Sequence, residues 1–434
     1  HGNAAGTGRL DKTHERVVGD TWNELLTYNK TVRKHSFDVM AGHEFYHYKY
    51  TYRMGEKTGF AFDEFDDLAM GSTIADTNSA TDLYAINSYM SRLNYSYDDR
   101  YYFSASYRMD ASSRFKKENR WGSFWSVGAS WRLSHEAWLK DVEWINNITL
   151  KASYGVQGND NLGSLYAWQS LYDMNYSNAN ASGAIIGSVE TPDVTWEKNG
   201  NLNLGLEFRL LNRITGTIEW YTRKTSDLLL EHPMAVSLGF PSYYANVGSM
   251  VNRGWDITIG GDVISTKDWR WNITLMASTL TNRVKQLTDN GEDIVSGNYL
   301  IREGEELNTF YLAKSAGVDP ATGDQLYWAY QKDKSGNRIP GSDYVTNDAT
   351  VATGCKYLMG SRIPDVYGSI STSLSFRDFD LSVLMTYSVG GKIYDGVYRS
   401  LMEPTFVGQA YHRNALRGWT TPGEITDVPK VTTT

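Results

Sequence analysis

The feature that most constrains this chain is the one-by-one alternation of apolar and polar residues along many short segments. In 202–210 every even-numbered residue is leucine or phenylalanine, whereas the odd-numbered residues are polar or glycine. Successive side chains of a strand point to opposite sides, so a period of two residues predicts β-strands with one apolar face. The same pattern recurs in 101–109, 125–133, 148–154, 214–221, 255–263, 269–279, 368–376 and 379–387.

The connections between these segments alternate between short and long. A soluble β-sandwich also alternates apolar and polar faces, but it has no reason to place all its long connections at one end. An outer-membrane barrel does, with short turns at one rim and long loops at the other. Short turns are predicted at Arg33–Lys34, Asp98–Asp99, Leu211–Arg213, Ser265–Asp268 and Arg377–Asp378, and long loops at about 55–82, 156–199, 224–252 and 282–366.

The composition supports a membrane barrel over a soluble β protein. Tyrosine and tryptophan are abundant, at 30 and 14 residues, although the mean hydropathy is only −0.46. A barrel uses such residues in its interfacial girdles and keeps a polar lumen. No stretch approaches the roughly 18 consecutive apolar residues of a membrane helix, so strands would have to span the bilayer. The net charge of −8 argues against a nucleic-acid partner.

The segment His43-Glu44-Phe45-Tyr46-His47 matches the H-E-x-x-H pattern of zinc proteases. That pattern needs a helix, whereas the aromatic-rich surroundings predict a strand. Four residues along a strand separate two imidazoles by roughly 13 Å, too far for both to lie about 2 Å from one zinc ion. We therefore expect no metal and no cofactor. The acidic clusters at 63–67 and 289–293 lack the spacing of a calcium loop and are interpreted as solvated loop charge.

A few further side chains could carry chemistry or bind a ligand. The single cysteine, Cys355, allows no internal disulfide, and no catalytic constellation is recognisable, so we do not expect an enzyme. The spacing of apolar residues predicts a short helix within 134–147. The first ten residues lack the pattern of a secretory signal, so we expect an exported protein to begin before His1. Aromatic residues in the long loops either pack their own loops or contact a sugar or peptide, and the candidate substrate-binding residues are Trp168, Tyr172, Tyr243 and Tyr244.

Six longer segments carry a further signal, and in chain order they are 107–139, 150–168, 191–212, 220–230, 246–259 and 417–430. Together, and in this order, they resemble the barrel signature of the SusC/RagA family of TonB-dependent importers. The resemblance runs from about Thr21 and implies an all-β, transmembrane antiparallel barrel with 22 strands when complete. Residues 1–20 are then a poorly defined N-terminal segment, 21–434 are a partial barrel, and the plug domain of the family has no counterpart.

The resemblance also implies a function and a location. The family imports oligosaccharides or oligopeptides across the outer membrane of Gram-negative bacteria of the Bacteroidota type. It works with a SusD-like surface lipoprotein as a lid, and with the TonB–ExbB–ExbD complex through a region that this chain lacks. Pairs of transporter and lipoprotein can dimerise. The alternatives are a TonB-dependent siderophore or cobalamin receptor and a non-transporting surface barrel.

The strands predicted here fall short of 22. An open sheet edge in lipid would leave backbone groups unpaired. We therefore expect the first and last strands of this chain to pair with segments outside it.

Overall fold

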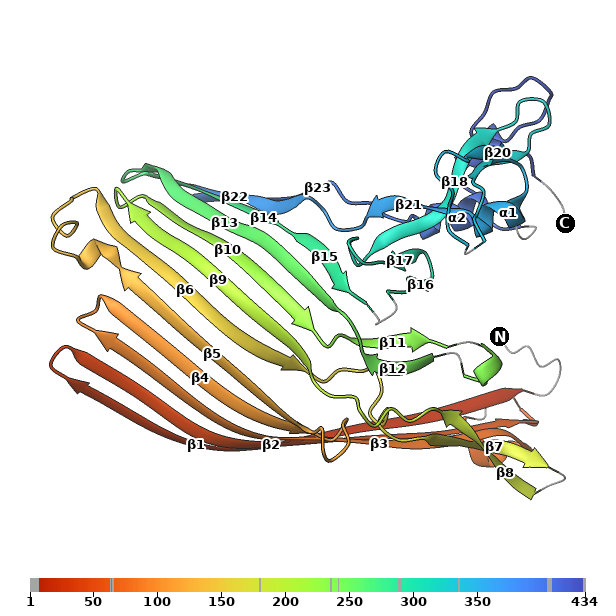
Figure 1. Ribbon diagram of the computed structural model, residues 1–434, viewed down its shortest axis with the longest axis horizontal. Helices are drawn as coiled ribbons and strands as arrows, with labels where there is room; N and C mark the ends of the chain where they lie inside the picture. The colour runs from red at the N-terminus through yellow and green to blue at the C-terminus, as the bar shows by residue number, and fades with distance from the viewer. Residues whose placement is uncertain are drawn as a thin grey trace. The chain divides into compact units, whose positions relative to one another are not determined.

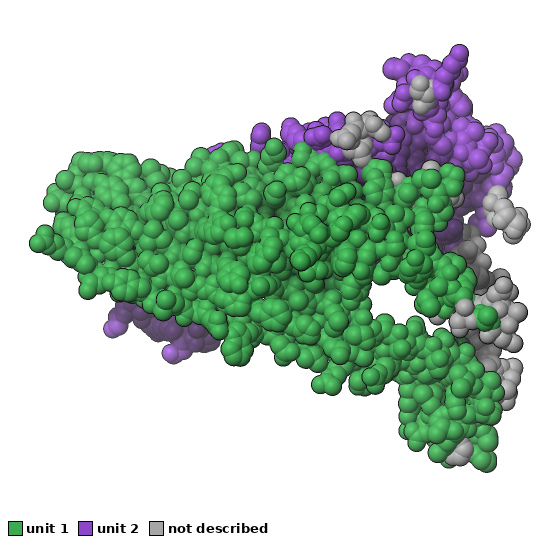
Figure 2. Space-filling model, turned by 60° about the horizontal axis from the view of Figure 1, so that its bottom comes forward, with its two compact units in different colours: residues 1–249, 259–263 green, residues 250–258, 264–434 purple. Residues whose placement is uncertain are grey.

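The computed structural model describes residues 8–62, 64, 66–178, 181–234, 236–240, 242–287, 291–334, 336–403 and 408–431, and these residues form mostly β-strands (Figure 1). The chain divides into two compact units, coloured separately in Figure 2. Unit 1 comprises His1–Ser249 and Ile259–Val263, and unit 2 comprises Met250–Thr258 and Ile264–Thr434. Each unit is described by itself.

Unit 1 is built on a large antiparallel sheet in which most neighbours in the chain are also neighbours in space. The one interruption is between β6 (Ile145–Asn159) and β9 (Glu197–Leu210), where the hairpin of β7 (Leu171–Asn178) and β8 (Ala181–Ser188) is inserted. A second hairpin, β11 (Leu229–Pro233) with β12 (Ser242–Asn246), follows the last strand of the unit 1 sheet along the chain. The strands of the sheet, in order, are β1 (Arg9–Val32), β2 (His35–Thr58), β3 (Thr73–Tyr97), β4 (Tyr101–Ser112), β5 (Trp121–Arg132), β6 (Ile145–Asn159), β9 (Glu197–Leu210) and β10 (Ile214–Ser226).

The predicted short turns are confirmed. Two or three residues connect β1 to β2, β3 to β4 and β9 to β10. Several of these residues adopt the left-handed backbone conformation that tight hairpins require, with φ of 54° at Arg33, 53° at Asp98 and 54° at Leu211. Each turn therefore keeps the two strands that it joins in register, so that their apolar residues lie on the same face of the sheet.

The first strands are longer than the sequence pattern indicated. β1 already begins at Arg9, within the segment 1–20 that was expected to precede the barrel. β2 runs to Thr58 and β3 starts at Thr73, with their pairing continuous from His35 opposite Tyr97 to Thr58 opposite Thr73 apart from one bulge. Half of the expected loop at 55–82 is therefore strand. In these parts of the two strands, polar and small residues lie on both faces. The sequence therefore shows no period-two alternation of apolar and polar residues there.

The helix predicted within 134–147 is wrong. The segment opens with a 3-10 turn, η2 (Leu133–His135), and continues as turns until β6 begins at Ile145. Most of its backbone hydrogen bonds span three residues. The Glu136 carboxylate accepts hydrogen bonds from Tyr101 Oη at 2.6 Å and Trp131 Nε1 at 3.0 Å. These contacts hold a tight turn against β4 and β5, and a helix this short gains little from its own hydrogen bonds.

Unit 2 contains a three-stranded antiparallel arrangement of β14 (Trp269–Thr279), β22 (Val366–Phe376) and β23 (Phe379–Val389). β13 (Ser249–Ser265) contributes residues to both units, and β15 (Thr281–Gln286) follows β14. Two short helices, α2 (Gly396–Met402) and η4 (Arg413–Arg417), lie toward the end of the chain. Among the described residues, neither α-helix of the chain has the length and apolarity needed to cross a membrane.

The long connection 282–366 folds into a sheet of its own. Its interior contains Leu300, Phe310 and Ala329, all less than 5% exposed. The segment near 419–430 packs on it, with Trp419 Nε1 donating to Pro320 O at 3.0 Å and Lys430 Nζ 2.8 Å from Asp324 Oδ1. The elements of this sheet are β16 (Ile294–Ser296), β17 (Tyr299–Ile301), β18 (Thr309–Val318), β19 (Gln325–Ala329), β20 (Tyr344–Thr346) and β21 (Lys356–Ser361), with α1 (Ala349–Gly354) before β21.

Candidate functional site: the polar face and the loop base of unit 1

The large sheet of unit 1 has one polar face. Its side chains line a cavity of about 490 Å³ between β2 and β10. A Cβ added at Gly128 would lie 2.8 Å from Ser104 Oγ, so the glycine leaves room for the serine side chain of the neighbouring strand. The face offers hydroxyl, amide and charged groups to whatever occupies it. Its polar lining includes Ser36, Asp38, Asn94, Ser104, Ser130, Lys151, Ser153, Asn203 and Glu219.

The opposite face is apolar and carries two rows of aromatic rings. One row lies beside the short turns, where Tyr101 stacks between Tyr97 at 6.4 Å and Trp131 at 6.2 Å. The other row includes Tyr89 and Trp121, with ring centroids 6.1 Å apart. Tyr89 and Tyr97 are separated by roughly 26 Å along β3, which is close to the height of about 25 Å of a barrel's apolar band. The two rows have the spacing of interfacial girdles.

Arg108 on β4 is the centre of a charged cluster on the polar face. Its guanidinium donates from Nη2 to Glu44 Oε1 on β2 at 2.7 Å and from Nε to Asp110 Oδ1 at 2.6 Å. Nη2 also lies 2.8 Å from Oγ of Ser88, which is fully buried on β3. One side chain therefore ties three strands together. A further ion pair joins Lys151 on β6 to Glu207 on β9.

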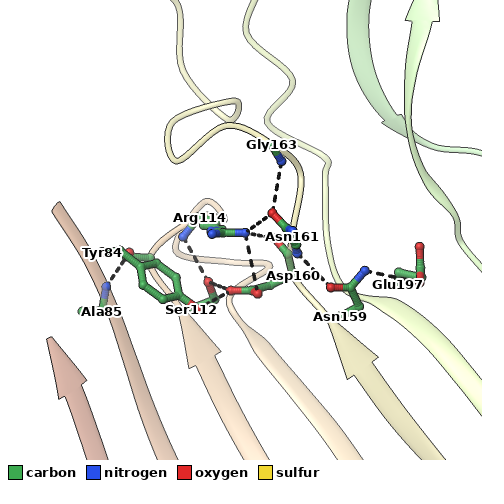
Figure 3. A network of polar contacts seen from close by, with 10 residues as sticks. Tyr84, Ala85, Ser112, Arg114, Asn159, Asp160, Asn161, Gly163 and Glu197 are labelled. Atoms are coloured by element: carbon green, nitrogen blue, oxygen red, sulfur yellow. Dashed lines mark hydrogen bonds and ion pairs between the residues drawn. The ribbon is translucent and has the colours of Figure 1, made fainter. Parts of the chain in front are cut away.

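A second polar network fastens the start of the 156–199 connection to β3 and β4 (Figure 3). The Asp160 carboxylate accepts from Tyr84 Oη at 2.7 Å and from Ser112 Oγ at 2.6 Å. Arg114 Nη1 donates to Asp160 O at 3.1 Å and to Asn161 Oδ1 at 2.9 Å, and its guanidinium lies 4.7 Å from the Tyr84 ring centroid. The network fixes the backbone at the point where β6 ends and the following loop begins.

An aromatic core stabilises the same loop base. Phe115, Phe124 and Trp196 are each at most 7% exposed, and the Trp196 ring lies 5.4 Å from Phe115 and 5.1 Å from Phe124. Trp196 Nε1 donates to Arg120 O at 2.7 Å. Gly158 has to be glycine here, because a Cβ would lie 2.1 Å from the Phe124 ring. Trp196 is therefore an architectural residue of this core.

The four candidate substrate residues do not form one cluster. Tyr243 and Tyr244 are neighbours on β12 and so point to opposite faces. Tyr244 packs against the aromatic core, and burial raises its pKa. Tyr243 lies 5.3 Å from the His232 ring. Tyr172, on β7, is 61% exposed.

The fourth candidate, Trp168, lies in the turn before β7. Its Nε1 is buried and has no hydrogen-bond partner among the described residues. The role of all four residues in substrate binding stays a prediction. Sequence reasoning missed the network of Asp160, because its residues come from three segments and no local pattern relates them.

The strand predicted around His43 is confirmed, since His43 and His47 lie on β2. His43 Nε2 is 2.7 Å from Asn87 Oδ1, and its Nδ1 is 3.7 Å from Glu24 Oε2. Within the described part of the chain, no group of three His, Cys, Asp or Glu side chains is placed to hold a metal ion. Of the acidic clusters, residues 63, 65, 289 and 290 lie outside the described residues, whereas Asp67 pairs with Lys12 and Asp293 with Arg302.

A sheet with one polar face, one apolar face with two aromatic rows, and short turns opposite long connections is the wall of an outer-membrane β-barrel. The family model described as "TonB dependent receptor-like, beta-barrel" matches residues 2–419, and the chain belongs to this family, as a barrel portion of the SusC/RagA type. Such receptors are β-barrels of the Gram-negative outer membrane.

Several relatives are similar along nearly the whole chain. The TonB-dependent receptor SusC of Bacteroides thetaiotaomicron is 30% identical over 385 residues, which are 86% of this chain and 38% of SusC. The TonB-dependent receptor P39 of Formosa agariphila is 27% identical over 95% of this chain and 43% of its own length. The structure of the RagAB peptide transporter superposes with a TM-score of 0.87 and 28% identity over 99% of this chain and 48% of the other. The chain thus spans less than half the length of these relatives.

Proposed function

We propose that this chain is part of the wall of a TonB-dependent importer that carries oligosaccharides or oligopeptides across the outer membrane. The observation that carries the proposal is the similarity to the RagAB peptide transporter over 99% of the chain. The similarity to SusC along 86% of the chain supports the same class.

The chemistry of the polar face agrees with a polar cargo. Oligosaccharides and oligopeptides expose many hydrogen-bonding groups, which lose free energy if they leave water without new partners. The face lines its cavity with serine, asparagine and charged side chains. A hydrated lumen with such a lining lets a polar solute exchange water for protein groups at little cost.

The partners in this proposal follow from the family. A SusD-like surface lipoprotein covers the rim that carries the long connections, and TonB–ExbB–ExbD supplies energy through a part of the protein outside this chain. In unit 1 the long connections carry the hairpins β7–β8 and β11–β12, and in unit 2 the long connection carries the sheet of 294–361. Two transporter–lipoprotein pairs associate in the complete assembly.

The test uses the full-length protein that contains this chain, expressed in cells with and without TonB. Uptake of a labelled oligopeptide library, a labelled oligosaccharide library and a ferric siderophore is measured in parallel, and the protein is purified to identify associated lipoproteins. We expect TonB-dependent uptake of peptides or glycans and a copurifying lipoprotein. Siderophore uptake without a lipoprotein would support the alternative receptor class, and no TonB-dependent uptake of any probe would support a surface barrel that does not transport.

A further inference from the structure

The apolar face of the sheet changes character along β1 and β2. Trp22 and Phe45 are opposite each other and exposed by 65% and 42%, level with the aromatic row that contains Tyr89. Both strands continue past this pair, away from the short turn at Arg33. Because alternate residues share a face, the positions that follow Trp22 and Phe45 on the same face can be identified from the register.

Those positions are basic. Arg16 lies opposite Thr51, Val18 opposite Lys49, and His14 opposite Arg53. Arg16 is therefore the diagonal neighbour of both Lys49 and Arg53, and all three cations are exposed. Thr51 lies opposite Thr81 on β3, which places two hydroxyl-bearing residues at the centre of the cations. We call Arg16, Lys49, Thr51, Arg53 and Thr81 the Arg16 patch.

The charges of the patch are not balanced within the described residues. Arg16, Lys49 and Arg53 make no ion pair there, whereas the neighbouring Lys12 pairs with Asp67. The acidic residue on this face nearest to the patch is Asp20, which lies opposite His47 and is the diagonal neighbour of Lys49, so that one carboxylate stands against three cations. Diagonal neighbours on a sheet are about 7 to 8 Å apart, so the three cations repel one another until an anion lies between them. This occurs in a chain whose net charge is −8.

The position of the patch on the sheet indicates which kind of anion it binds. It lies on the same face as the aromatic rows, and Lys49 follows Phe45 by roughly 13 Å along β2. The lipid tails of the outer leaflet end at the aromatic row, so the patch faces the phosphate-bearing head groups just above it. Arginine binds phosphate through paired hydrogen bonds, and lysine and threonine add a charge and hydroxyl donors.

We propose that the Arg16 patch binds the phosphate groups of an anionic glycolipid in the outer leaflet of the membrane. The glycolipid neutralises the three cations, and its acyl chains lie on the apolar face below. Free inorganic phosphate would supply the same charge but not the apolar contact. The site is separate from the polar face and does not depend on the cargo of the importer.

The experiment uses the intact transporter in detergent and measures binding of purified lipopolysaccharide by native mass spectrometry. The patch variant combines Arg16→Gln, Lys49→Gln and Arg53→Gln. The matched control combines Lys314→Gln, Lys332→Gln and Lys334→Gln, which removes the same charge from exposed positions elsewhere. Heat-modified gel migration verifies that each variant is folded. Dephosphorylated lipopolysaccharide and inorganic phosphate serve as further probes for the wild-type protein.

We expect the patch variant to bind lipopolysaccharide about 100-fold more weakly, since each basic residue near an anionic surface adds about fivefold to the affinity. The control variant should bind like the wild type, and dephosphorylated lipid should bind weakly to the wild type. Salt should weaken wild-type binding, a measurement that needs no variant. Three results would overturn the proposal. They are unchanged lipopolysaccharide binding by the folded patch variant, wild-type binding of the dephosphorylated lipid as strong as that of lipopolysaccharide, and inorganic phosphate that competes as strongly as lipopolysaccharide does. A patch variant that loses a copurifying protein and keeps its lipid would overturn it as well.

Discussion

The guanidinium of Arg108 on β4 crosses β3 to reach Glu44 on β2, with Nη2 2.7 Å from Oε1. The contact is made on the polar face, and Ser88 of the intervening strand is fully buried beneath it. Strand neighbours in a sheet are already joined by backbone hydrogen bonds. A side chain that links next-nearest strands adds resistance to shear between them.

Replacing Arg108 should therefore destabilise the wall. Arg108→Gln leaves Glu44 and Asp110 without their cation and should lower the stability of the folded barrel by about 2 kcal/mol. Arg92→Gln is the matched control, because Arg92 makes a longer contact of 3.4 Å to Asp38. The measurement is the temperature at which the folded band disappears in a heat-modifiability gel. Equal temperatures for the two variants would contradict the structural role of Arg108.

The apolar face of β9 should face lipid. Leu206 shares this face with Leu204, and its neighbours across the ladder are Leu150 and Ile218. Leu206→Arg should cost roughly 2 to 4 kcal/mol at the middle of the bilayer, whereas Glu207→Ala on the polar face should cost much less. Folding yields into lipid vesicles measure the difference. If both variants assembled equally well, the assignment of faces would be wrong. The same prediction holds for Phe208, Ile257, Ile273, Leu381 and Val383.

The network of Asp160 should govern the order of the loop base. Asp160→Asn weakens the hydrogen bonds from Tyr84 and Ser112 and removes the attraction to Arg114. Residues 160–165 should then be cleaved faster by an added protease on intact cells. Asp193→Asn, in the same connection but exposed, should leave the cleavage rate unchanged. Identical rates for the two variants would show that the network does not hold the loop.

The candidate substrate residues should separate into two kinds. Tyr172 is 61% exposed, so Tyr172→Ala should leave stability unchanged and weaken uptake if this side chain contacts cargo. Tyr244 packs against the core of Phe115 and Trp196, so Tyr244→Ala should lower the unfolding temperature. Uptake kinetics and thermal unfolding of both variants test the distinction. A Tyr172→Ala protein with normal uptake of every transported probe would remove this residue from the site.

The sheet of 294–361 should loosen in acid. The Tyr357 hydroxyl and the Arg338 guanidinium both donate to Asp343 and hold the pKa of this carboxyl below its usual value of 3.8. A depressed pKa stabilises the folded form above the unfolded value and ceases to do so as the pH falls through the folded value. Protease sensitivity of this segment should rise below about pH 4. Asp343→Asn should show a smaller rise in sensitivity across that window, and a profile identical to that of the wild type would contradict the assignment.

The sequence predicted the wall better than the connections, for physical reasons. The turn at Asp98–Asp99 and the alternation of β9 depend on residues adjacent in the chain, so both were predicted and are confirmed. β16 and β17 have only three residues each, which is too short for a period to register. The pairing of β18 with β21 joins Thr309 to Ser361, and no local pattern reports such a contact.

The candidate site was predicted less well than the fold. Aromatic residues in the loops, such as Tyr172, could be chosen as candidate ligand contacts from their residue type alone. The burial of Tyr244, however, depends on partners that are far away in the sequence. Arg114 and Asp160 are 46 residues apart. Their contact exists because β4 and β6 are held at fixed positions in the sheet, which a single sequence does not specify.

The register of β14 and β22 brings Thr279 opposite Val366, so the two strands pair up to the edge of the long connection that separates them in the chain. A segment whose two ends are fixed at neighbouring positions can be lengthened, shortened or exchanged without moving the strands that carry it. The sheet between 294 and 361 can therefore change in length without altering the register of β14 and β22, as long as Pro320 and Asp324 keep their contacts with the segment near 419–430.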